Sequence, residues 1–168
     1  MNIFNGGLHA LREGEQLGRE RIDIQEVMIV PQSASSYAEA LAMGDAIDAT
    51  LKELLHKDFP AENIMRADEA GFSVKGLGQS RDAIDYVMKA IEGAGYLPGA
   101  DVGLALDVAA SSFYESTSDR YLFQGKEVGA SEMTDYYLGL ADAYPGKIVS
   151  IEDGLGENDW QEWPTLTR

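Results

Sequence analysis

Hydrophobic and polar residues follow two patterns along the chain, one typical of β-strands and the other of amphipathic helices. Short apolar runs bounded by glycine or proline predict strands, and apolar residues three or four positions apart predict helices. Strands are predicted at residues 21–31, 101–110 and 147–152, a small hairpin at 121–128, and helices at 35–58, 80–96, 131–146 and from 159 onward. This order predicts an α/β fold in which helices cover the outside of a parallel sheet.

Residues that commonly begin or end helices mark the predicted boundaries. Ser35 or Ser36 would cap the first helix and Ser80 the second, because a serine hydroxyl can accept a hydrogen bond from the first-turn backbone. Gly93 or Gly95 would end the second helix. No linker, low-complexity tract or internal repeat interrupts this order, so the sequence predicts a single domain.

Two of the predicted strands end on acidic residues. One apolar run leads into Asp107 and another leads into Glu152. The carboxyl ends of neighbouring parallel strands share one edge of a sheet, where ligands bind, so these two side chains would lie side by side. Two converging carboxylates repel each other unless a proton or a cation lies between them. With oxygen ligands and no thiolates, the pair predicts a site for Mg²⁺ or a similar hard cation.

The alternative interpretation is that these carboxylates cap helices or pair with lysine or arginine. The strand before Glu152 is expected to be buried, because Ile148, Val149 and Ile151 are apolar and β-branched. An unpaired charge at the end of a buried strand is costly. A bound cation would therefore explain why this strand carries an acid.

The composition narrows the ligands and the cellular setting. The 168 residues include 29 acidic and 13 basic side chains, giving a net charge of −16. This charge repels nucleic acids and anionic membranes, so we expect no nucleic-acid partner and no membrane insertion. The lack of cysteine excludes disulfides, thiolate metal sites and thiol catalysis. With no signal-peptide pattern and no apolar run of ~20 residues, we expect a cytoplasmic protein.

Three further ionisable residues allow a structural or a functional interpretation. Glu26 interrupts an apolar strand, where it would either face solvent or belong to a site. Glu69 lies in a loop beside Gly71, where a carboxylate can approach a ligand closely, although an ordinary loop acid is the simpler interpretation. His9 follows a flexible Asn-Gly-Gly turn that could place its imidazole over a site; otherwise it is an exposed loop histidine.

Several long motifs resemble, in order and approximate spacing, the catalytic barrel domain of enolase. The motifs are "MNIFNGGLHA", "DIQEVMIVP", "ADEAGF", "LALDVAASSFY" and "YPGKIVSIEDGLGENDWQEW". The resemblance covers the whole chain and implies an α/β fold, a partial (β/α)₈ TIM-type barrel whose first connections depart from strict alternation. It implies that residues 1–168 are one domain, the first half of that barrel, with the N-terminal capping domain and the later barrel strands absent.

Resemblance to enolase implies a lyase, phosphopyruvate hydratase, that dehydrates 2-phosphoglycerate to phosphoenolpyruvate in glycolysis with Mg²⁺ as cofactor. Asp107 and Glu152 match two of the three carboxylates that hold the first Mg²⁺ in this family. Glu69 matches the acid that assists departure of the hydroxyl group, and Glu26 matches its partner carboxylate. His9 matches a histidine on a mobile loop that closes over the substrate, so His9 and Glu26 are the expected substrate-binding residues.

The chain also departs from the family pattern. The usual "GDEGGFAP" is "ADEAGFSV" here, with Ala67 and Ala70 in place of glycines, and the usual "EDP" is "EDG" at Gly154. The segment 11–22 is several residues longer than its usual counterpart. These changes affect the loops that would carry the acid and the histidine.

Two classes of function follow from the resemblance. The first is the enolase reaction, for which we expect the 168-residue chain alone to be inactive, because no lysine in it matches the family's catalytic base. The alternative is a non-catalytic enolase-like domain that binds a protein or a cation. In both cases an unclosed barrel would expose strand edges and apolar surface, so we expect self-association into homo-oligomers.

Overall fold

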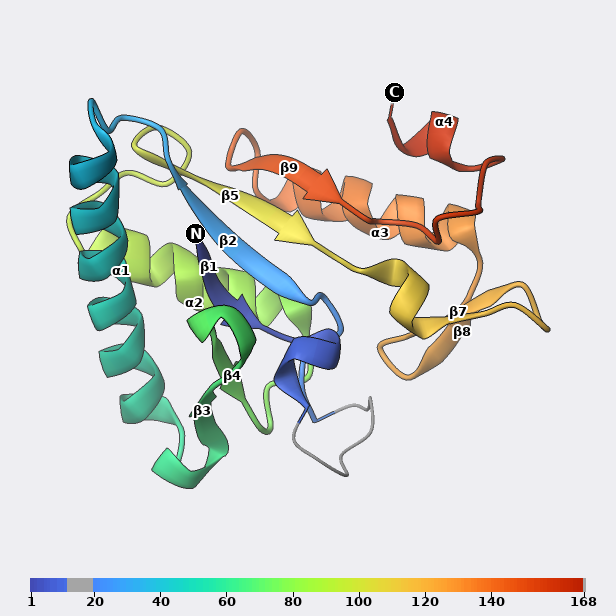
Figure 1. The fold of residues 1–168 in the computed structure, drawn as a ribbon, viewed down its shortest axis with the longest axis horizontal. Helices are drawn as coiled ribbons and strands as arrows, with labels where there is room; N and C mark the ends of the chain where they lie inside the picture. The colour runs from blue at the N-terminus through green and yellow to red at the C-terminus, as the bar shows by residue number, and fades with distance from the viewer. Residues whose placement is uncertain (12–19, 168) are drawn as a thin grey trace.

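The computed structural model describes residues 1–11 and 20–167, and the chain folds around one main β-sheet (Figure 1). Over these residues the sheet has six strands in the order β3-β4-β1-β2-β5-β9. Its strands are β1 (Asn2–Asn5), β2 (Glu26–Pro31), β3 (Ile64–Arg66), β4 (Phe72–Val74), β5 (Val102–Asp107) and β9 (Ile148–Glu152). A small sheet contains β6 (Tyr114–Glu115), β7 (Arg120–Phe123) and β8 (Lys126–Val128).

Helices cover one face and one side of the main sheet. They are α1 (Tyr37–Asp58), α2 (Ser80–Gly93), α3 (Ala130–Ala143) and α4 (Trp163–Leu166), with 3₁₀ turns η1 (Gly7–Ala10), η2 (Ala61–Asn63), η3 (Asp68–Ala70) and η4 (Ala110–Phe113). Figure 1 shows α2 and α3 behind the strands and α1 beside them. The helix predicted from residue 159 onward is thus limited to the single turn of α4. Within the described part of the chain, none of the helices combines the length and hydrophobicity needed to cross a membrane.

The sheet is mixed, so the prediction of a parallel sheet was wrong for its first strands. β2 runs antiparallel to both of its neighbours, β1 and β5, whereas β5 and β9 are parallel. Between β2 and β5 the chain passes through α1, the antiparallel pair β3 and β4, and α2, and β5 then enters the sheet in the direction opposite to β2. A single crossover helix, α3, separates β5 from β9 and gives the parallel pair. The structure is therefore a partial barrel whose opening connections depart from strict alternation, as the resemblance implied.

The predicted helix boundaries are mostly confirmed. Ser36 caps α1, and its side chain accepts a hydrogen bond from the backbone N of Glu39 at 3.2 Å. The predicted cap of α2 was wrong by one residue, because Gln79 occupies the N-cap position and Ser80 is the buried first residue of the helix. The helix ends at Gly93, close to the predicted position.

The predicted hairpin is confirmed as β7 and β8, and β6 adds a third strand that was not predicted. Gln124 and Gly125 form its two-residue turn and have φ values of 50° and 68°, as expected for a type I′ turn. Tyr121 and Phe123 on β7 point into the core. Asp23 accepts a hydrogen bond from the backbone N of Gln124 at 2.5 Å, which ties the hairpin to the segment before β2.

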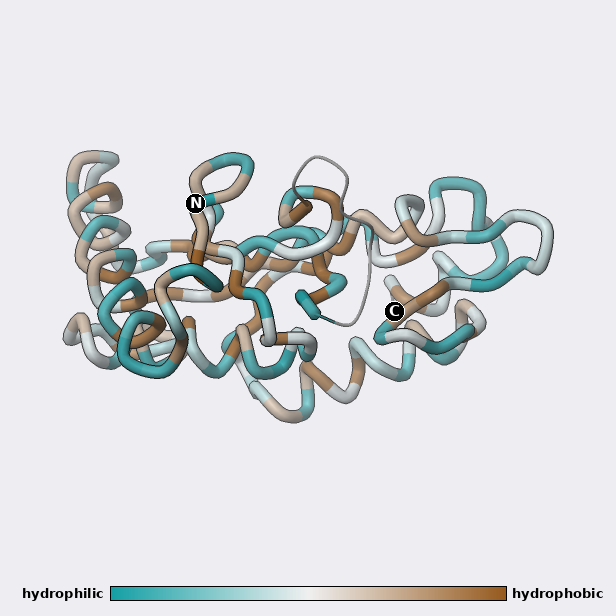
Figure 2. The backbone as a smooth tube through the Cα atoms, turned by 90° about the horizontal axis from the view of Figure 1, so that it is seen from below, coloured by the Kyte–Doolittle hydropathy of each residue, from teal (hydrophilic) through white to brown (hydrophobic). Residues whose placement is uncertain are grey.

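The hydrophobic core lies between the main sheet and the helices. On α1 the buried residues recur at helical spacing, with Ile47, Leu51 and Leu55 all fully buried. Figure 2 shows the layers from below, with hydrophobic stretches concentrated in the central strands and hydrophilic ones in the outer loops. This packing stabilises the sheet from the helix side and leaves the ends of the strands available for a site.

The apolar run before Glu152 forms β9, which was predicted to be buried but is the outermost strand of the sheet. Over residues 1–11 and 20–167, only β5 pairs with it. Val149 is 46% exposed, and Ser150 and Glu152 are exposed as well. The apolar residues of β9 are typical of a strand that has a paired strand on each side, but here one edge of β9 is open.

Candidate active site

Three carboxylates form a row across three neighbouring strands of the sheet. Glu26 begins β2, Asp107 ends β5, and Glu152 ends β9. Glu26 pairs in register with Asp107, and Asp107 pairs in register with Glu152. Because β2 runs antiparallel to β5, its first residue lies at the carboxyl ends of the other two strands. The predicted proximity of Asp107 and Glu152 is confirmed, and Glu26 joins them.

Burial differs along this carboxylate row. Glu26 is only 6% exposed, so the interpretation of it as a solvent-facing strand residue was wrong. Asp107 is half-buried, and Glu152 is exposed. The expectation of a buried Glu152 was therefore wrong, because among the residues that the structure describes β9 has no second neighbour to cover it. Burial along the row therefore decreases from Glu26 to Glu152.

Two loops bring His9 and Glu69 to Glu26. His9 belongs to η1 and Glu69 to η3. The Nδ1 atom of His9 lies 3.1 Å from Oε1 of Glu26, and His9 is half-buried, so it is not an exposed loop histidine. One ligand atom each from His9, Glu26 and Glu69 lies within 4.8 Å of the others. All five predicted site residues thus gather at the same edge of the sheet.

Close packing, more than flexibility, explains the two glycines before His9. A Cβ atom on Gly6 would lie 2.2 Å from the carbonyl oxygen of Ile22, so only glycine fits there. Gly7 has φ of 50°, a left-handed conformation that favours glycine. Its backbone N donates to the carbonyl of Ile22 at 2.9 Å, and that of Gly6 donates to Gln25 at 3.0 Å. These contacts fix the start of η1, and with it the position of His9.

The loop that carries Glu69 is held by a polar side chain from β1. The side-chain nitrogen of Asn5, which is buried, donates to the backbone carbonyl of Asp68. Gly71 packs against the same side chain, since a Cβ atom there would lie 2.5 Å from Oδ1 of Asn5. Glu69 and Ala70 both have left-handed conformations, with φ of 54° and 64°. The loop therefore presents Glu69 through a strained backbone.

Two carboxylates of the site, Glu26 and Asp107, have raised pKa values. Burial is the main cause of the raised pKa of Glu26, and the charge of Glu69 raises it further, while His9 acts in the opposite direction. Burial also raises the pKa of Asp107, and the nearby charge of Glu152 adds to this effect. Like charges at close range favour a proton or a cation between them. The site is thus suited to holding either one.

The ligand atoms present fit a hard cation. Asp107 and Glu152 offer carboxylate oxygens from strands in register, and Mg²⁺ is commonly held by one or two carboxylates and water. His9, Glu26 and Glu69 offer a second group of ligand atoms, which was not predicted as a metal site. Its histidine nitrogen suits Mg²⁺ less well than an all-oxygen set does. The oxygen pair is the better match, because both of its residues offer carboxylate oxygens.

Two further residues belong to this edge and were not predicted. Ala109 and Asp153 follow the carboxyl ends of β5 and β9, and both have a left-handed φ of 49°. The backbone N of Ala109 donates to Oδ1 of Asp107 at 3.0 Å. The charge of Asp153 contributes to the raised pKa of Asp107. The adjacent acids in "IED" were a signal for Asp153, whereas nothing in the sequence marks Ala109.

A hollow of about 350 Å³ opens beside the carboxylate row. Two of its lining residues are neighbours of site residues in the chain: Leu8 precedes His9, and Asp153 follows Glu152. Its lining residues are Leu8, Gln25, Ala109, Ser111, Ser112, Asp153, Leu155 and Glu157. None of the five predicted site residues lines this hollow, so it adjoins the site only through their neighbours in the chain.

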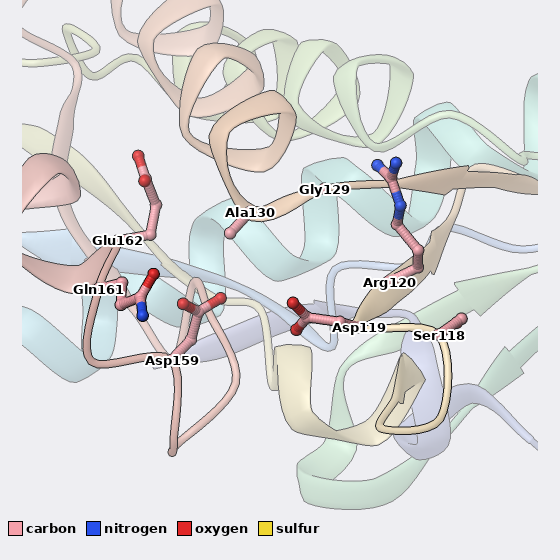
Figure 3. Close-up of a pocket in the computed structure, with 8 residues that line it drawn as sticks. All are labelled: Ser118, Asp119, Arg120, Gly129, Ala130, Asp159, Gln161 and Glu162. Atoms are coloured by element: carbon pink, nitrogen blue, oxygen red, sulfur yellow. The ribbon is translucent and has the colours of Figure 1, made fainter.

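A second hollow, of about 430 Å³, lies between the hairpin, the N-terminus of α3 and the segment before α4 (Figure 3). Its lining residues are Ser118, Asp119, Arg120, Gly129, Ala130, Asp159, Gln161 and Glu162. None of the predicted site residues lines it. The candidate active site is therefore the carboxylate row with His9 and Glu69.

A comparison with models of known protein families gives a match that covers the whole of this chain. The model of the family described as enolase, C-terminal TIM barrel domain, matches residues 1–168. A partial barrel with acids at the carboxyl ends of its strands agrees with that match. The chain therefore belongs to the enolase C-terminal TIM barrel domain family, whose members are lyase-type enzymes.

Proposed function

We propose that this chain supplies the acid and part of the metal site of a cytoplasmic phosphopyruvate hydratase, which dehydrates 2-phosphoglycerate to phosphoenolpyruvate in glycolysis. The proposal rests on one observation above the others. Glu26, Asp107 and Glu152 lie in register across three strands, with His9 and Glu69 facing the first of them. An arrangement that gathers so many carboxylates is suited to a reaction that needs both a proton donor and a cation.

Asp107 and Glu152 would hold Mg²⁺. When bound, Mg²⁺ neutralises the negative charge that develops on the substrate carboxylate as the α-proton is removed. The two residues come from neighbouring parallel strands, so the sheet itself sets their spacing. The third carboxylate and the second-metal loop of the family pattern have no match in this sequence, so we expect weak binding.

Glu69 and Glu26 would hold and donate the proton that the leaving hydroxyl group needs. Burial, and after it the nearby charge of Glu69, raise the pKa of Glu26, so Glu26 keeps its proton at a higher pH than an ordinary glutamate would. Glu69 is exposed and can reach a substrate, whereas Glu26 is buried behind it. We therefore assign proton donation to Glu69 and proton retention to Glu26. His9, beside Glu26, would contact the substrate.

The reaction also needs a base for the α-proton, and no lysine of this chain matches that position in the family. General-base help is commonly worth ~10²–10⁴-fold in rate. We therefore expect no measurable turnover by the 168-residue chain alone. Later barrel strands and a capping domain would have to supply the base, the third metal carboxylate and the second-metal loop.

The test is the absorbance of phosphoenolpyruvate formed from 2-phosphoglycerate in the presence of Mg²⁺. The chain alone should give no product, and activity should appear when a matching barrel half and capping domain are added in trans. Glu69→Gln should abolish the restored activity, whereas Glu132→Gln, an equal charge change at an exposed position on α3, should not. Restored activity that survives Glu69→Gln would contradict the assignment. Turnover by the chain alone would mean that it contains a base.

A second candidate is a non-catalytic domain that binds a cation or a protein. The open edge of β9 favours it, because Val149 is 46% exposed on a strand that, within residues 1–11 and 20–167, pairs with β5 alone. Such an edge favours pairing with another chain, and we propose that copies of this protein associate in solution. The net charge of −16 opposes association, but physiological salt screens it beyond ~8 Å. Light scattering over a wide concentration range should show dimers or larger species, and a monomer throughout would count against association.

A further inference from the structure

The segment after β9 is held more tightly than β9 itself. Glu152 and Asp153 are exposed, yet Gly154, Leu155 and Gly156, which follow them directly, are buried. Leu155 is only 1% exposed and belongs to the core. The residues at the proposed metal site are thus joined to an anchored segment.

Two tyrosines and a tryptophan make that anchor. The hydroxyl of Tyr137 on α3 donates to the backbone carbonyl of Gly154 at 2.8 Å. The hydroxyl of Tyr121 on β7 accepts from the backbone N of Gly156 at 2.8 Å, and Trp163 donates to the carbonyl of Gly156 at 3.0 Å. A Cβ atom on Gly156 would lie 3.2 Å from the Tyr121 hydroxyl, so glycine permits this close approach.

The hydroxyl group of Tyr121 both accepts and donates a hydrogen bond. Besides accepting from Gly156, it donates to Oδ2 of Asp159 at 2.9 Å. Its ring is 1% exposed and packs against Tyr114 and Phe113, which fixes the direction of the hydroxyl. Figure 3 shows Asp159 on the same segment as Gln161 and Glu162. One buried hydroxyl thus joins the hairpin to both ends of a turn.

The other side of the site is held by the backbone after β5. The N–H of Val108 donates to the carbonyl of Glu152 at 3.1 Å, and that of Ala110 donates to Asp153 at 2.9 Å. Asp153 has a left-handed φ of 49°, which a non-glycine residue keeps only when its surroundings hold it there. The backbone of Glu152 and Asp153 is therefore fixed between β5 on one side and the tyrosine contacts on the other.

We infer that Tyr121 is a positioning residue for the metal-binding end of β9. Its hydroxyl holds Gly156 and Asp159, in the segment that directly follows Glu152 and Asp153, and so limits the movement of their backbone next to Asp107. The inference rests on the metal site proposed above. The competing interpretation is that Tyr121 only fills the core with its ring. Replacement by phenylalanine separates the two, because it keeps the ring and removes the hydroxyl.

The test compares Tyr121→Phe with Tyr114→Phe. Tyr114 is a matched control, because its ring packs on Tyr121 and its hydroxyl also donates to an aspartate, Asp119, at 2.7 Å, but not to the segment after β9. Amide hydrogen exchange is measured first, without metal. Tyr121→Phe should speed exchange at Gly156 and at residues 152–154 by about tenfold, and Tyr114→Phe should leave it unchanged.

Calorimetric titration with MgCl₂ follows, at a temperature where each variant is fully folded. Tyr121→Phe should bind Mg²⁺ about tenfold more weakly than the wild type, and Tyr114→Phe within twofold of it. Unchanged exchange at 152–156 in Tyr121→Phe would overturn the inference. Faster exchange with unchanged Mg²⁺ affinity would also overturn it, because the hydroxyl would then be structural only. A wild type without Mg²⁺ binding would refute the proposed metal site, while the exchange data would still decide whether Tyr121 positions this backbone.

Discussion

Ala70→Gly should stabilise the protein, although glycine usually destabilises. Ala70 has φ of 64° in η3, where the enolase motif usually has glycine. A left-handed conformation costs a non-glycine residue ~1–2 kcal/mol. The alanine side chain is exposed, so its removal loses no packing. The loop contacts use the backbone, with Ala70 N donating to Ala67 at 3.1 Å and its carbonyl accepting from Arg66 at 2.6 Å.

The expected gain is the relief of strain less the entropy cost of glycine. Glycine makes the unfolded chain more flexible, which costs ~0.4–1 kcal/mol. The net effect is a gain of ~0.5–1 kcal/mol in the free energy of unfolding. Ala49→Gly serves as the matched control, because Ala49 is also exposed but lies in the middle of α1. There the same substitution should cost ~1 kcal/mol.

Urea unfolding followed by circular dichroism measures both variants. With a slope of ~2 kcal/mol per molar urea, the two midpoints should move in opposite directions and differ by ~1 M. The reasoning is refuted if Ala70→Gly loses as much stability as Ala49→Gly. That result would mean that the backbone at Ala70 is not strained in solution.

Two other substitutions test the same region. Gly71→Ala should destabilise the protein by ~1–3 kcal/mol in the same urea assay, because its Cβ would meet Oδ1 of Asn5 at 2.5 Å; a neutral result would mean that Asn5 can move aside. Glu26→Gln should raise the free energy of unfolding at pH 7 by ~0.5–2 kcal/mol, because burial and the charge of Glu69 raise the pKa of Glu26 above its ordinary 4.5. As the pH falls, Glu26 takes up a proton in the folded state before it does so in the unfolded state, and this removes the cost of its buried charge. The advantage of Glu26→Gln should therefore shrink as the pH falls from 7 toward 4.5. An advantage independent of pH would contradict the cause given for the raised pKa.

The sequence predicted those parts of the site that depend on strand order. Asp107 and Glu152 each end an apolar run, and parallel strands separated by one helix bring their carboxyl ends together. The hairpin was predictable for a similar reason, since two short runs flank a two-residue turn at Gln124 and Gly125. Both inferences use rules that act between neighbouring elements.

Features that depend on distant contacts were missed or misread. Glu26 was ambiguous because its exposure depends on His9 and Glu69, which come from separate loops. The burial expected for Glu152 requires a neighbour on the far side of β9, which a hydrophobic pattern alone cannot supply. The strand β1 escaped notice because four residues, Asn2–Asn5, are too few for a clear alternation. The strands β3 and β4, which lie between α1 and α2, were missed for the same reason, since each has only three residues.

The central claim is that Asp107 and Glu152 form an oxygen site for Mg²⁺ at the carboxyl ends of β5 and β9. Calorimetric titration of MgCl₂ into the wild type, Asp107→Asn and Asp142→Asn tests it most directly. Asp142 is an exposed acid on α3, so its substitution makes the same change in net charge away from the site. We predict weak binding to the wild type, equal binding to Asp142→Asn, and no measurable binding to Asp107→Asn. Equal heats for the wild type and Asp107→Asn would contradict the claim.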